Sequence, residues 1–218
     1  QVGSSAASDV YKRQHLAFGI VSGLIHSVKT GEGQVVDSAM IDGSLSLMSF
    51  FYSLKEMGHW EDKRESNLLD GFAHFYDTYE CKDGTFIAVG SIEPQFYEEL
   101  LLKLDIDNEN FKDQYNKELW PELKNLIAIK IKSKTRSEWV EIFSNSDACV
   151  SPVLNMEEAK SHPHNISRNA FIDVDGFNQP NVSPRYSKSK TEIKHNAKKI
   201  GSDSVSYTHL RAHETSRN

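Results

Sequence analysis

Apolar residues recur at helical spacing in two early stretches of the chain. Residues 16–27 form a mostly apolar run with several small side chains, which is typical of the end of a buried helix. Glycines then interrupt the pattern, and a short β-branched segment follows at 34–37. From Ala39 an apolar face recurs at helical spacing until Gly58, which is suited to end a helix. This second pattern predicts a helix of about five turns.

The next part of the sequence predicts a hairpin. Residues 75–80 and 85–89 are aromatic and β-branched runs, and the segment that joins them ends in Asp83-Gly84. Asp-Gly between two such runs is a strong hairpin signal, because both residues tolerate the positive φ angles of a tight turn. We therefore expect two antiparallel strands here.

Signals for helix starts follow the hairpin. Pro94 suits the first turn of a helix and places Glu93 at or near its N-cap, and Pro121 is expected to open the next helix. Thr135 and Glu138 have the spacing of a capping box, which predicts a further helix from that point.

The last third of the chain predicts smaller elements. Residues 150–154 have a strand pattern, and Asn155 and Glu158 match a second capping box. Beyond His162 the content of Pro, Asn, Ser and Lys rises, so we expect an extended tail there. The order of these elements describes a small α/β unit without internal repeats, rather than a whole enzyme.

Composition adds limits on the class of protein. With 218 residues, of which 38% are hydrophobic and 26% charged, the chain can form one globular domain or two small ones. Its net charge of −6 disfavours a nucleic-acid-binding surface, which needs clustered Lys and Arg. No run approaches the roughly 20 apolar residues of a membrane span and no secretory leader is apparent, so we expect a cytoplasmic protein with no membrane partner.

Both ends of the sequence look foreign. Residues 4–14 and 205–215 resemble translations of sequencing-library adapters, and neither stretch has apolar periodicity. We therefore interpret 1–14 and 205–218 as foreign tails and exclude them from the fold prediction.

Carboxylates and histidines are the remaining candidates for chemistry, because no phosphate-cradling, nucleophile-elbow or zinc-protease motif occurs. The helix after Glu93 directs its first N–H groups and positive dipole end towards that residue, which keeps a carboxylate ionised. Such a group could orient a histidine for proton transfer, although helix capping is the commoner role. His74 is expected to be structural, and Cys81 and Cys149 lack CxxC spacing, which predicts reduced thiols.

Other candidates have simpler interpretations. His162 and His164 flank a proline without nearby cysteines or spaced carboxylates, so a turn is expected there and no metal site. Met40, Met48 and Met57 lie along one predicted helix. They predict core filling or, as the alternative, a pliable surface for an acyl chain.

Ordered motifs across most of residues 15–185 resemble those of α-methylacyl-CoA racemases in the family III CoA-transferase superfamily, which includes CaiB/BaiF-like proteins. The motifs that support this resemblance are GEGQVVDSAM at 31–40, NLLDG at 67–71, FYDTY at 75–79, VGSIEPQFY at 89–97 and DACVSPVL at 147–154. Several long matches in the same order make the resemblance specific.

The resemblance implies an interlocked homodimer in which each chain has a large Rossmann-like domain that binds CoA and a smaller domain. It implies transfer of the α-proton of a 2-methylacyl-CoA, with no metal or redox cofactor, since coenzyme A is part of the substrate. The implied domains are the end of the large domain at 15–38, a linker helix at 39–72, the small domain at 73–160 and a return segment at 161–204. CoA phosphates then become an alternative partner for the basic stretch 129–136, which is most simply a solvated helix end.

The resemblance also assigns site residues. Glu93 matches the family's glutamate, which would pair with a catalytic histidine of the other subunit, while the family's His and Asp lie upstream of this chain. Leu69, Tyr76 and Ile92, with Met40, would bind the acyl part of the substrate. Two alternatives stay open: a family III CoA transferase, which moves CoA between carboxylic acids, and a non-catalytic dimerisation fragment. We further expect an exposed apolar patch around residues 16–25.

Overall fold

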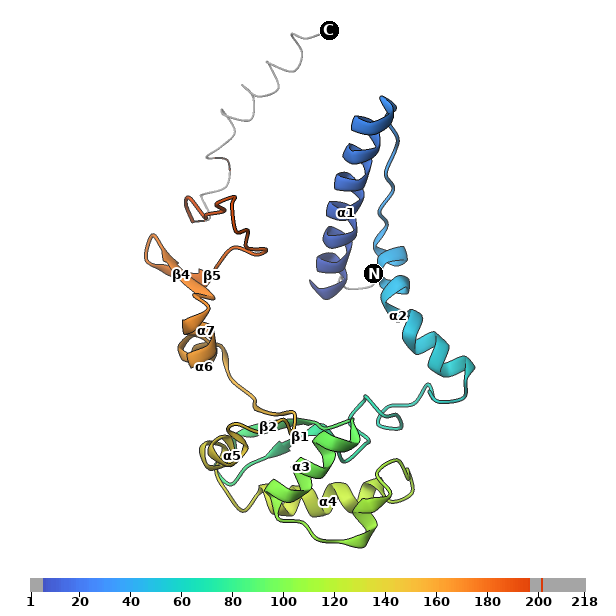
Figure 1. The fold of residues 1–218 in the computed structure, drawn as a ribbon, viewed down its shortest axis with the longest axis vertical. Coiled ribbons are helices and arrows are strands. Elements are labelled where there is room, and N and C mark those ends of the chain that lie inside the picture. Colours follow the sequence, from blue (N-terminus) through green and yellow to red (C-terminus); the bar gives the residue numbers. More distant parts are fainter. Residues whose placement is uncertain (1–5, 197–200, 202–218) are drawn as a thin grey trace. The chain divides into compact units, whose positions relative to one another are not determined.

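The computed structural model describes residues 6–196 and 201 (Figure 1). The chain divides into two compact units, Gln1–Pro152 and Val153–Asn218. The first contains a pair of helices and a small α/β body, and the second contains two short helices and a hairpin. This mixture of helices and small sheets confirms the α/β class predicted from the sequence. Within the described residues, no helix combines the length and apolar content needed to cross a bilayer.

The first unit begins with helices α1 (Ala6–Thr30) and α2 (Met40–Glu56). Both predicted helices are present, and Gly58 follows α2 with a φ of 75°, which suits the end of a helix. Helix α1 also includes residues 6–14, which have no apolar periodicity. The tail predicted at 205–218 lies outside the described residues.

The segment between α1 and α2 runs back along α1 (Figure 1). Gly19 permits this close approach, because a Cβ atom there would lie 2.7 Å from Cγ1 of Val36. The β-branched residues 34–37 are extended but form no strand. They contact a helix rather than a sheet edge, so their β propensity is not satisfied by ladder hydrogen bonds.

The helix pair exposes much of its apolar surface. On α1, Phe18 is 75% exposed and Leu24 is 61% exposed, which confirms the apolar patch predicted at 16–25. The methionines of the α2 stripe are also exposed: Met40 at 39%, Met48 at 44% and Met57 at 67%. Core filling within this chain is therefore the wrong interpretation of the stripe.

A three-stranded antiparallel sheet forms the centre of the α/β body, with strands in the order β1 (Tyr76–Glu80), β2 (Phe86–Gly90) and β3 (Val150–Pro152). The predicted hairpin is confirmed, with Tyr79 opposite Ile87 in its register. Gly84 adopts the positive φ of 77° that the turn requires. Strand β3 joins the other edge of β2, with Val150 opposite Val89.

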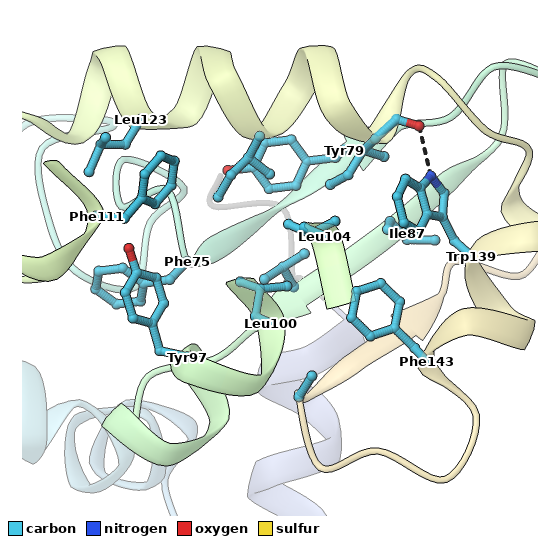
Figure 2. Packing of buried hydrophobic residues seen from close by; sticks show 14 of the residues in the cluster. Phe75, Tyr79, Ile87, Tyr97, Leu100, Leu104, Phe111, Leu123, Trp139 and Phe143 are labelled. Atoms are coloured by element: carbon cyan, nitrogen blue, oxygen red, sulfur yellow. Dashed lines mark hydrogen bonds between the residues drawn. The ribbon is translucent and has the colours of Figure 1, made fainter. Parts of the chain in front are cut away.

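Helices cover one face of this sheet. They are α3 (Pro94–Leu104), the 3₁₀ turn η1 (Glu109–Lys112), α4 (Trp120–Ile131) and α5 (Arg136–Phe143). Figure 2 shows their apolar side chains meeting those of the strands, with Trp139 donating to the Ile131 carbonyl oxygen at 2.8 Å. Since Tyr79, Ile87 and Val89 point to this core, the alternate strand residues belong to the opposite, uncovered face.

The predicted capping boxes are both present. Thr135 caps α5 and its backbone N–H donates to Glu138 Oε2 at 2.8 Å. Asn155 and Glu158 do the same for α6 (Met156–Ser161) in the second unit. These reciprocal bonds satisfy backbone donors that a helix start leaves without partners, so the local sequence fixes where each helix begins.

The predicted extended tail is wrong between residues 163 and 180. Helix α7 (Pro163–Ser167) is followed by a hairpin of β4 (Phe171–Val174) and β5 (Phe177–Pro180). His162 is the N-cap of α7, so the pair of histidines marks a helix start rather than a loop turn. Asp175 and Gly176 form the hairpin turn with positive φ angles of 54° and 80°. The Asp-Gly signal was thus present, but the polar composition of the tail obscured it.

Candidate functional site

The uncovered face of the sheet forms the floor of an open hollow of about 470 Å³. Its volume lies in the range of small-molecule sites. The lining residues come from three places: the segment before β1, the two hairpin strands, and the chain around the start of β3. They are Asp70, Gly71, Tyr76, Asp77, Thr78, Ala88, Val89, Gly90, Cys149 and Ser151.

Strand alternation explains why this face differs from the core face. Tyr76, Thr78, Ala88 and Gly90 alternate with the buried residues of the same strands. The small residues Ala88 and Gly90 leave open space above the sheet, and the half-buried ring of Tyr76 forms one wall. A Cβ atom at Gly90 would lie 3.8 Å from the Tyr76 ring. The floor is therefore mainly apolar.

Two carboxylates at the edge of the hollow already have partners. Asp77 forms an ion pair with Lys124 at 2.5 Å, and Lys124 also donates to the Gly71 carbonyl oxygen. Burial raises the pKa of Asp70, but hydrogen bonds from Ser66 and Asn67 outweigh it and hold that pKa below its usual value. Both carboxylates therefore have structural partners within the chain and are not free proton acceptors.

Glu93 stands apart from these paired carboxylates. It occupies the N-cap position of α3 with φ −72° and ψ 142°, yet its side chain makes no capping hydrogen bond. Its side chain is exposed. Burial, and then the negative charges of Glu93 and Asp147, raise the pKa of the Cys149 thiol, which places Glu93 within electrostatic range of a residue that lines the hollow. The capping interpretation of the Glu93 side chain is thus wrong.

The other predicted substrate-binding residues lie in different places. Tyr76 lines the hollow, whereas Leu69 and Ile92 are half-buried neighbours of Asp70 and Glu93 that do not line it. Met40 is the first residue of α2 and does not line it either. The structure therefore brings Tyr76 to the hollow but does not join all predicted residues in one pocket.

His74 is buried beneath the sheet as a structural residue. Its Nε2 atom lies 2.6 Å from the Tyr97 hydroxyl, and its imidazole is fully buried. Burial lowers the pKa of His74 to about 4, so the ring is neutral at physiological pH. A neutral buried ring without solvent contact cannot serve as the proton shuttle of an open site.

Sequence reasoning missed several residues of the hollow. Thr78 and Ala88 could have been found from the period of two along the predicted strands. Cys149 could not, because its place depends on a left-handed backbone with φ 53° and on a hydrogen bond from Gly90 to its carbonyl oxygen. Among the described residues, no group of three or more His, Cys, Asp or Glu side chains is placed to hold a metal ion.

Comparison with known proteins identifies the family. The model of CoA-transferase family III matches residues 2–204. The chain belongs to CoA-transferase family III. This finding confirms the superfamily resemblance that the motifs indicated.

Two racemases are similar to this family III chain. It is 44% identical over 181 residues to α-methylacyl-CoA racemase of Mus musculus, covering 83% of this chain and 47% of the mouse protein. It is 43% identical over 169 residues to α-methylacyl-CoA racemase of Homo sapiens, covering 78% of this chain and 44% of the human protein. The chain thus spans about half the length of these relatives.

A solved CaiB/BaiF family protein from Brucella suis has a similar fold. Its TM-score is 0.75 at 17% identity, and the match covers 96% of this chain and 56% of the other. At this identity the likeness supports the fold alone.

Proposed function

We propose that this family III chain is the C-terminal half of an acyl-CoA racemase that moves the α-proton of a 2-methylacyl-CoA thioester between two faces. The similarity to the mouse and human racemases supports the reaction class. The structural observation that supports it most is the Glu93 carboxylate, which is exposed at the start of α3 and is not used as a helix cap.

Glu93 is proposed to orient a histidine of the partner subunit. Glu93 lies at the N-terminal end of α3, and a carboxylate can fix the tautomer of an imidazole and stabilise its protonated form. The histidine can then deliver or remove a proton at the α-carbon. In this scheme Glu93 is a positioning residue, and the proton-transfer residues belong to the parent protein outside this chain.

The hollow on the sheet is proposed to bind the acyl part of the substrate. Its apolar floor includes Ala88 and Gly90, and Tyr76 forms a wall. Leu69, Ile92 and Met40 remain proposed acyl contacts in the assembled parent. Coenzyme A enters as part of the substrate, and no metal or redox cofactor is proposed.

The chain alone is proposed to be inactive. A racemase must hold a proton donor and a proton acceptor on opposite faces of one carbon, and the residues that line the hollow include no histidine. The domain limits at 15–38, 39–72, 73–160 and 161–204 are likewise proposed for the parent, together with an interlocked homodimer.

A family III CoA transferase is the alternative activity, because the family description itself names that reaction. A dimerisation fragment without catalysis is a third possibility, and the exposed apolar residues of α1 and α2 favour it for the chain by itself. The reaction product separates the first two: a racemase exchanges the α-proton and leaves the thioester intact.

The test is deuterium uptake from solvent into a 2-methylacyl-CoA, catalysed by the parent protein expressed from the gene with its natural sequence upstream of His15. We expect rapid uptake by the wild type and a loss of about 100-fold in Glu93→Gln. Glu98→Gln is the matched control, because Glu98 is exposed on the same helix α3. Transfer of CoA between acids without deuterium uptake would instead establish the transferase.

A further inference from the structure

The backbone immediately before Glu93 is held by buried polar side chains. Gln114 is only 7% exposed, and its Nε2 atom donates to two successive carbonyl oxygens, that of Ser91 at 3.0 Å and that of Ile92 at 2.9 Å. The Tyr115 hydroxyl donates to the same Ile92 oxygen at 2.7 Å. Three side-chain hydrogen bonds therefore converge on the two peptide groups that precede Glu93.

Ser91 fixes the same segment from the other side. It is fully buried, its hydroxyl donates to the Ala148 carbonyl oxygen at 2.5 Å, and its backbone N–H donates to the Phe75 carbonyl oxygen at 3.0 Å. The segment is thereby tied both to the chain before β1 and to the chain before β3. These are two of the places that supply the walls of the hollow.

Gln114 is itself anchored to the core. The indole N–H of Trp120 donates to the Gln114 carbonyl oxygen at 2.8 Å, and Trp120 is only 2% exposed. A continuous series of hydrogen bonds therefore runs from α4 through Gln114 to the residue before Glu93. Gln114 is thus held at its backbone carbonyl by Trp120 and at its side-chain amide by the Ser91 and Ile92 carbonyl oxygens.

Burying these polar side chains costs desolvation free energy, which a merely space-filling role would not require. Burying a primary amide is favourable only when its donors find partners, and an apolar side chain of similar size would fill the same space. The carboxylate at the end of this segment, by contrast, makes no capping bond. The backbone of Glu93 is thus fixed while its side chain stays available.

We infer that Gln114 is a positioning residue for Glu93: by bridging the Ser91 and Ile92 carbonyl oxygens it fixes the direction in which the Glu93 carboxylate leaves α3. The inference rests on the proposed function for its catalytic consequence. Its structural part, that Gln114 holds this turn, can be tested in the chain itself.

The variant is Gln114→Met, which keeps the length and volume of the side chain and removes both donors. The control is Trp139→Phe, because Trp139 is 1% exposed and also donates one buried side-chain hydrogen bond, at 2.8 Å to Ile131, away from this segment. Both variants should lower the melting temperature. Only the first should disturb the turn before Glu93.

Hydrogen exchange in the 218-residue chain tests the structural part. In Gln114→Met we expect the amides of Ser91 and Tyr97, which donate to Phe75 and Glu93, to exchange at least about tenfold faster, and in Trp139→Phe to stay near the wild-type rate. Unchanged exchange at both amides in Gln114→Met would overturn the inference.

Steady-state kinetics of the parent protein test the catalytic part. A misplaced carboxylate should lower kcat for α-proton exchange by about 10-fold to 100-fold while KM changes less than about twofold. Equal losses in Gln114→Met and Trp139→Phe would reduce Gln114 to a general structural role and overturn the inference. If the wild-type parent shows no α-proton exchange, the proposed function fails, and the exchange rates at Ser91 and Tyr97 still decide whether Gln114 holds the turn.

Discussion

The α/β body and the helix pair α1–α2 use apolar residues in opposite ways. In the body, the large side chains of the sheet and helices bury one another, and Phe75, Leu100 and Ile127 are fully buried. In the helix pair, apolar residues repeat with the same regularity, but Phe18 and Val28 remain mostly exposed. The body therefore contains its own core, whereas the helix pair leaves much of its apolar surface exposed.

This contrast shows that helical periodicity alone does not indicate self-contained packing. A periodic apolar stripe indicates which face of a helix is apolar, but it does not indicate which part of the same or another chain packs against that face. Many of the apolar residues at 16–27 and the methionines of the α2 stripe remain exposed and are not buried by the α/β body. An interlocked parent dimer, as proposed, would supply a surface that buries them.

The largest expected difference between the two regions is in the cost of removing an aromatic ring. Phe75→Ala should lower the free energy of unfolding by about 3 to 5 kcal/mol, because its ring is fully buried and lies 5.7 Å from that of Trp120. Phe18→Ala in α1 should change it by less than about 0.5 kcal/mol. Urea denaturation measures both, and equal losses would contradict the contrast.

The next largest effect is expected in the pH dependence of the free energy of unfolding. Burial lowers the pKa of His74 from 6.5 to about 4, so the unfolded chain binds a proton in that interval and the folded chain does not. The contribution of His74 to the free energy of unfolding is therefore fully present above pH 6.5. It should fall by about 3 kcal/mol as the pH drops from 6.5 to 4.

His74→Gln should flatten this slope while keeping a hydrogen-bonding group near Tyr97. His59→Gln is the control, because His59 is exposed just after α2. Urea unfolding at several pH values measures the slope. A slope in His74→Gln as steep as in the wild type would show that other groups cause the pH dependence.

Helix caps should give a smaller difference. Thr135→Ala removes a reciprocal capping box in the body and should cost about 1 kcal/mol in thermal or urea unfolding. Helix α2 begins after Ala39 without a side-chain cap, so Ala39→Asp should raise helicity measured by circular dichroism and leave unfolding of the body unchanged. A stabilised body in Ala39→Asp would mean that the two regions unfold together.

The smallest effect on stability is expected from polar substitutions on α1. Leu24→Ser combined with Val28→Ser replaces side chains that are 61% and 86% exposed, so unfolding should change by less than about 0.5 kcal/mol. Binding of the dye ANS and aggregation should nevertheless both fall, because an exposed apolar patch is removed. A wild-type chain that is monodisperse and does not bind ANS would contradict the predicted patch.

Local signals in the sequence predicted most of the elements. Asp83-Gly84, Pro94 and the two capping boxes each mark a structure that is decided within a few residues. The second hairpin was missed because Asp175-Gly176 lies in a polar context that suggested an extended tail. The Asp-Gly pair determines this turn locally, whereas the polar composition around it led to the wrong prediction.

The site was predictable only in part, because it depends on long-range contacts. The resemblance selected Glu93 and Tyr76 from their motifs. The hydrogen bond from Gln114 to Ile92, which supports Glu93, joins residues 22 positions apart and could not be read from spacing. The same holds for Cys149, whose left-handed backbone brings it to the hollow.

Glu93 is proposed to assist α-proton transfer in a family III racemase. The most direct test compares deuterium uptake into a 2-methylacyl-CoA by the wild-type parent protein, Glu93→Gln and Glu98→Gln. We expect rapid uptake by the wild type and Glu98→Gln, and uptake about 100-fold slower in Glu93→Gln. No uptake by the wild type, or equal uptake by all three proteins, would contradict this proposal.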